Sequence, residues 1–93
     1  MANFILTFRA PEDTQTGDES AWMQWFGELG GAIVDMGSRV GATSPLGAAP
    51  SDSVVTGFTT IKADNLEAAV LLAKGCPAIA HGGGVEVGEL IAM

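Results

Sequence analysis

Residues 20–31 read SAWMQWFGELGG, and this stretch decides how the rest of the chain can fold. Its large apolar side chains recur three and four positions apart, which places them on one face of an α-helix. Asp18 or Ser20 can cap this helix, and Gly30 with Gly31 supplies the left-handed backbone that usually ends one. The predicted apolar stripe consists of Trp22, Trp25, Phe26, Leu29 and Ile33.

Short segments on both sides of this helix have the character of strands. Residues 3–8 form a brief apolar run that ends at Arg9, and residues 33–40 alternate with a period of two. Gly37 interrupts that alternation and indicates a bulge. Residues 11–18 are polar and turn-forming, so they connect the first strand to the helix. The first part of the chain is therefore predicted to be strand, helix, strand.

The second part of the chain repeats this arrangement. Residues 54–63 are predicted to form a strand, and residues 66–73 carry a second amphipathic helical stripe. Asp64 and Glu67 have the spacing of a capping box, with Asp64 in the cap position. A last strand is expected over residues 85–90, where acidic side chains stand between apolar ones.

The predicted order of elements is β-α-β-β-α-β. Right-handed crossovers place both helices on one face of a four-stranded antiparallel sheet, which is the ferredoxin-like α+β arrangement. The second sheet face then has no helix to cover it. Exposed apolar surface costs about 25 cal/mol per Å², so two copies are expected to press these faces together. The expected assembly is a homodimer with a barrel-like interior.

Length and charge exclude several classes of protein. The 93 residues, with a mass of 9.5 kDa, make one domain over positions 1–93. Four basic and eleven acidic residues leave a net charge of −7, which argues against nucleic acid or anionic membrane surfaces as partners. One cysteine and one histidine provide neither a disulfide nor a zinc site. No targeting or membrane-spanning segment is recognisable, so a cytoplasmic protein without metal or cofactor is expected.

Residues 75–87, GCPAIAHGGGVEV, resemble the YCII-related family of dimeric α+β barrels. Further agreement lies in residues 4–6, 22–37, 57–58 and 64–73, so the resemblance spans nearly the whole chain. It implies the same fold and a dimer, similar to muconolactone isomerase and monooxygenase-type enzymes. Members proposed to be enzymes pair a histidine on the first helix with an aspartate on the next strand.

This chain departs from two sequence patterns of that family. Residues 20–33 contain no histidine, although Asp35 occupies the following strand. A second branch of the family carries Asp-Gly-Pro-Phe before the third strand, whereas residues 56–58 read TGF here. No histidine–aspartate pair is therefore carried over from the family.

His81 is the candidate for acid–base chemistry. Histidine is the only type of side chain in this sequence whose unperturbed pKa lies near neutral pH. Three glycines, residues 82–84, follow it and allow a close approach of backbone to a ligand. As a proton donor or acceptor His81 would need an orienting carboxylate, either Asp35 or Glu86. The alternative is a solvated loop histidine, and the glycines are then a tight turn.

Two further side chains are candidates for ligand binding. Arg9, at the end of the first strand, could clamp a carboxylate; otherwise it pairs with an acidic group on the surface. Trp22 could line a pocket or face the partner subunit; otherwise it packs in the core. Cys76 is expected to be a small buried hydrophobe at the end of the second helix, where Pro77 stops the chain from continuing helically.

Three functions remain open on these residues. The first is a dimeric module that binds a small, largely apolar molecule between the helices, the sheet and a long loop over residues 41–53, using Arg9, Trp22 and His81. The second is a cofactor-free enzyme of the dimeric-barrel type, in which His81 transfers protons with Asp35 or Arg9. The third is a structural or regulatory dimerisation domain.

Overall fold

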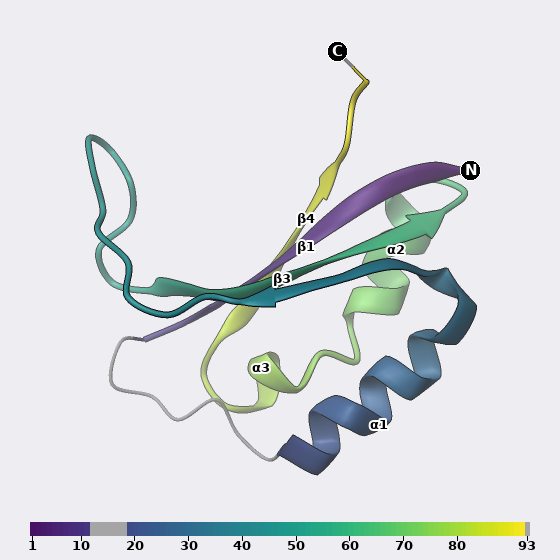
Figure 1. Ribbon diagram of the computed structural model, residues 1–93, viewed down its shortest axis with the longest axis horizontal. Coiled ribbons are helices and arrows are strands. Elements are labelled where there is room, and N and C mark those ends of the chain that lie inside the picture. Colours follow the sequence, from purple (N-terminus) through teal and green to yellow (C-terminus); the bar gives the residue numbers. More distant parts are fainter. Residues whose placement is uncertain (12–18, 93) are drawn as a thin grey trace.

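A computed structural model describes residues 1–11 and 19–92 of the chain, so the predicted Asp18 cap lies outside the described residues. Figure 1 shows one sheet with helices packed against it. The elements are β1 (Ala2–Ala10), α1 (Glu19–Leu29), the 3-10 turn η1 (Gly30–Ala32), β2 (Ile33–Arg39), β3 (Val54–Ala63), α2 (Leu66–Ala73), α3 (Pro77–Ala80) and β4 (Gly84–Glu89). The predicted β-α-β-β-α-β order is confirmed, with the one-turn helix α3 added before β4.

The sheet has the order β2-β3-β1-β4, and every neighbouring pair of strands is antiparallel. The ferredoxin-like α+β fold predicted from the sequence is therefore confirmed. Alternate residues of β1 are buried, because a period of two sends them all toward the helices. They pack with residues of α1 and α2 in one core, whose members include Phe4, Leu6, Phe8, Trp25, Leu29, Ile61, Ala69 and Ala73.

The opposite face of the sheet is more polar than the sequence analysis expected. Residues directly opposite one another in a sheet share a face. On this open face Ile5 lies opposite Thr60, and Thr7 lies opposite both Phe58 and Glu86. Ile5 and Phe58 are half-buried there, and threonines and charged side chains lie beside them. The second face therefore mixes apolar and polar side chains, because strand alternation turns Phe4, Leu6 and Phe8 of β1 toward the helices.

Strand β2 begins where the sequence analysis extended the helical stripe. Ile33, which the sequence analysis placed both in the helical stripe and at the start of the strand, is the first residue of β2 and lies opposite Ile61. The pairing with β3 shifts register twice, once on each side of Asp35. Gly37 lies at the second shift with a φ of 71°, so the predicted bulge is confirmed.

The cap of α2 lies one residue beyond the predicted position. The side-chain oxygen of Asn65 accepts a hydrogen bond from the backbone N–H of Ala68 at 2.8 Å, and Asn65 is the residue before the helix. The predicted Asp64 cap is wrong, because α2 begins at Leu66 and its first free N–H groups therefore lie within reach of residue 65.

Substitution of the two adjacent residues tests this assignment. Asn65→Ala should lower the free energy of unfolding by about 1 kcal/mol, since a helix donor loses its partner. Asp64→Ala, at an exposed site beside the cap, should change it by less than about 0.5 kcal/mol. Urea denaturation of both variants measures the difference. A larger loss for Asp64→Ala would contradict the Asn65 cap.

Candidate functional site

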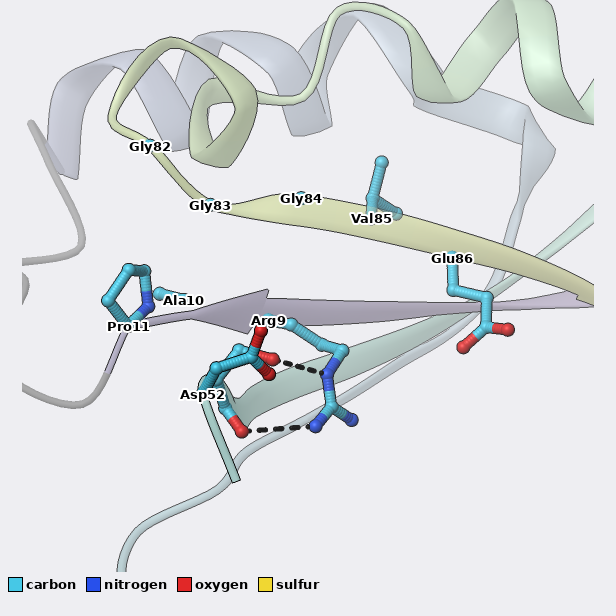
Figure 2. Close-up of a pocket in the computed structure, with 10 residues that line it drawn as sticks. Arg9, Ala10, Pro11, Asp52, Gly82, Gly83, Gly84, Val85 and Glu86 are labelled. Atoms are coloured by element: carbon cyan, nitrogen blue, oxygen red, sulfur yellow. Dashed lines mark hydrogen bonds between the residues drawn. The ribbon is translucent and has the colours of Figure 1, made fainter. Parts of the chain in front are cut away.

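A cleft of about 390 Å³ lies where three distant segments of the chain meet. Residues 9–11 form the end of β1, residues 52–53 precede β3, and residues 82–86 run from the turn after α3 into β4. Figure 2 shows these residues around the cleft. Two of the three segments were predicted to carry site residues, and residues 52–53 end the loop over residues 41–53 that was predicted to border the ligand pocket.

Arg9 is held in a fixed position at this cleft. Its Nε donates a hydrogen bond to Ser53 Oγ at 3.0 Å, and its Nη2 donates to the Ser53 carbonyl oxygen at 3.1 Å. Both acceptor oxygens belong to Ser53, the residue directly before β3 and 44 positions along the chain from Arg9. The guanidinium is thus anchored by a neutral serine, and the sequence held no local signal for this contact.

The turn between α3 and β4 approaches β1 so closely that a side chain has no room at Gly83. A Cβ at this position would overlap the carbonyl oxygen of Arg9. The Gly83 N–H donates to the Ala78 carbonyl oxygen at 2.8 Å, which closes the turn. The glycine run is therefore a tight turn whose bare backbone forms one wall of the cleft.

Two charged side chains of the cleft, Arg9 and Glu86, lie on the open face of the sheet. In Figure 2, Val85 points toward the helices, whereas Arg9 and Glu86 point the opposite way. Asp52 adds a second carboxylate from the segment before β3. The lining therefore holds one positive and two negative side chains, which differs from the largely apolar pocket that the sequence analysis expected.

His81 and Asp35 lie far apart within one chain. His81 follows α3 and is exposed, next to the glycines of the cleft but outside its lining. Asp35 is on β2, and its Oδ1 accepts a hydrogen bond from the Gly37 N–H at 2.8 Å. Strands β2 and β4 are the two edges of the sheet, separated by about 14 Å at a spacing of about 4.8 Å per strand. The fold therefore does not bring the imidazole to this carboxylate.

Trp22 packs with the aromatic side chains beneath the sheet. Its ring meets Phe8 edge to face, with centroids 5.0 Å apart, and lies 5.9 Å from both Trp25 and Phe26. The side chain is half-buried and lies outside the lining of the cleft. This position corresponds to the core-packing alternative for Trp22.

Cys76 is buried, as the sequence predicts, but its position differs from the predicted helix end. Pro77 is the first residue of α3, so it starts a helix instead of stopping one, and Cys76 is the residue before that helix. Burial raises the pKa of the Cys76 thiol, and the nearby backbone amides of Ala78 and Ile79 oppose this only in part. A neutral thiol is therefore favoured here.

The raised pKa of Cys76 predicts a loss of stability in alkali. Above the ordinary thiol pKa the unfolded chain releases a proton that the folded chain retains, so stability falls as the pH rises through this range. Stability measured by urea denaturation should drop more between pH 7 and about pH 9.5 for the natural chain than for Cys76→Ala. Equal drops in the two proteins would contradict a raised thiol pKa.

Comparisons with protein-family models, with curated proteins and with solved structures gave no match to this chain. No helix among residues 1–11 and 19–92 is long and apolar enough to cross a membrane. Within the same ranges, no group of three or more His, Cys, Asp or Glu side chains is placed to hold a metal ion.

Proposed function

We propose that this chain is a dimeric module that binds a small, largely apolar molecule by its polar end at the Arg9 cleft. The observation that carries the proposal is an arginine anchored beside bare glycine backbone in a concavity of about 390 Å³. Small-molecule sites are clefts of about 300–1,000 Å³ with a few placed polar groups. The resemblance of residues 75–87 to the YCII-related dimeric α+β barrels supports the dimer in this proposal.

A second copy would supply the apolar part of the binding site. The open face spans four strands about 4.8 Å apart and nine residues of β1 at about 3.3 Å each, which is on the order of 600 Å². Two such faces bury on the order of 1,200 Å², the lower end for a stable interface. Ile5 and Phe58 lie at the centre of this face, where they would contact the partner.

The enzyme hypothesis has less support. Its proposed histidine is outside the cleft, and Asp35 is on the far edge of the sheet. A domain that only dimerises would need no anchored arginine beside a cleft. Binding is therefore the function that the arrangement of side chains favours over the other two.

Amide NMR of the labelled protein tests the proposal. A panel of fragments with fewer than about 15 non-hydrogen atoms should shift the amides of Gly83, Gly84 and Glu86. Arg9→Met should weaken that binding at least about tenfold, because a charge-assisted hydrogen bond contributes about 1.5–3 kcal/mol. Arg39→Met is the matched control, because Arg39 is an exposed residue of β2. It should bind the fragments with the affinity of the natural chain. Shifts confined to other regions, or equal affinities for both variants, would overturn the proposal.

A further inference from the structure

We infer that the polar end of the ligand is zwitterionic, as in an α-amino acid with an apolar side chain. This inference rests on the proposed function and names the ligand class of the same cleft. The evidence is that, among the described residues, positively and negatively charged side chains line the same cleft but form no ion pair with one another. Arg9, Asp52 and Glu86 come from three separate segments and line one concavity.

The spacing of these groups follows from the strand register. Arg9 lies opposite Gly84, so Glu86 is its diagonal neighbour on β4, at about 7–8 Å. Asp52 adjoins Ser53, whose hydroxyl is 3.0 Å from Arg9 Nε. Within the described ranges the guanidinium is hydrogen-bonded to Ser53 and forms no ion pair with either carboxylate. The cleft therefore presents separated positive and negative groups.

A zwitterion satisfies both kinds of group at once. A guanidinium has five N–H donors, and Ser53 occupies two of them, which leaves three for a ligand carboxylate. The two side-chain carboxylates can accept hydrogen bonds from a ligand ammonium group. An anion alone would face two negative groups, and a cation alone would face the arginine. The glycine backbone at residues 82–84 leaves space for the ligand to approach both.

Three probes that share the isobutyl side chain of leucine separate these possibilities. L-leucine carries both charged groups, 3-methylbutan-1-amine lacks the carboxylate, and 4-methylpentanoate lacks the ammonium group. NMR titration at pH 7 should show leucine binding at least about tenfold tighter than either analogue. In Arg9→Met the protein should bind leucine no more tightly than the amine, because the carboxylate has lost its partner. In the double variant Asp52→Asn with Glu86→Gln it should bind leucine no more tightly than the acid, because the ammonium group has lost its partners. His81→Gln, outside the lining, should keep the leucine preference.

The outcomes distinguish this inference from the proposed function. If the acid or the amine binds at the cleft as tightly as leucine, the zwitterion is excluded while small-molecule binding at Arg9 stands. If none of the three probes shifts the cleft amides, the zwitterion is also excluded, and the fragment panel decides the proposed function independently. A leucine preference that Arg9→Met leaves intact would overturn the assignment of the carboxylate to Arg9.

Discussion

Replacing Trp25 with alanine should lower the free energy of unfolding by about 3–5 kcal/mol. The side chain is 3% exposed and meets Phe8 edge to face with ring centroids 5.8 Å apart. Its Nε1–H also donates to the Leu72 carbonyl oxygen at 3.2 Å, which joins α1 to α2. Domains of this size are stable by about 5–15 kcal/mol, so the loss is a large share of the total.

Two companion variants separate the ring from its N–H group. Trp25→Phe keeps most of the packing but leaves the Leu72 carbonyl without its donor, so a loss of about 1–2 kcal/mol is expected. Met23→Ala, on the same helix but 69% exposed, should change stability by less than about 0.5 kcal/mol. Guanidinium denaturation followed by circular dichroism gives all three values. A loss for Trp25→Ala no larger than for Met23→Ala would show that Trp25 is not a core residue.

Gly37→Ala should be the most damaging small substitution on β2. Gly37 has a φ of 71°, a conformation that L side chains rarely adopt, and its Cβ would overlap the carbonyl oxygen of Phe58. Because that carbonyl belongs to the neighbouring strand, relief of the overlap requires the edge of the sheet to move. A loss of at least about 2 kcal/mol in the free energy of unfolding is expected.

Gly27→Ala is the matched control for this substitution. Gly27 lies within α1, and a Cβ there would meet no atom within 4 Å. Alanine in a helix interior is favoured over glycine by about 0.5–1 kcal/mol, so this variant should be more stable than the natural chain. Urea denaturation of both variants should therefore give changes of opposite sign. Two losses of similar size would contradict the strain assigned to Gly37.

The fold was predictable because its signals are local. The apolar stripe of α1 and the alternation in β1 each lie within about ten consecutive residues, and their order specifies the topology. The errors concern single positions. Asn65 caps α2 in place of Asp64, and Pro77 begins a helix that was not expected, because adjacent residues can serve the same end of an element.

The candidate site was only partly predictable. Arg9 and the glycines stood out by residue type, but the contact between Arg9 and Ser53 depends on how a loop returns over 44 positions. No short stretch of sequence predicts that the loop before β3 brings Ser53 next to Arg9. The open face was misjudged because the count of apolar residues in a strand includes both faces, whereas Phe4, Leu6 and Phe8 all point to one.

The molar mass of the purified chain in solution tests most directly whether two open sheet faces pair around the Arg9 cleft. Light scattering at about 50 µM protein should give twice the chain mass of 9.5 kDa. Ile5→Lys, at the centre of the open face, should halve that mass without loss of the folded circular dichroism spectrum. A mass of 9.5 kDa for the natural chain would contradict the dimer and leave the open face uncovered.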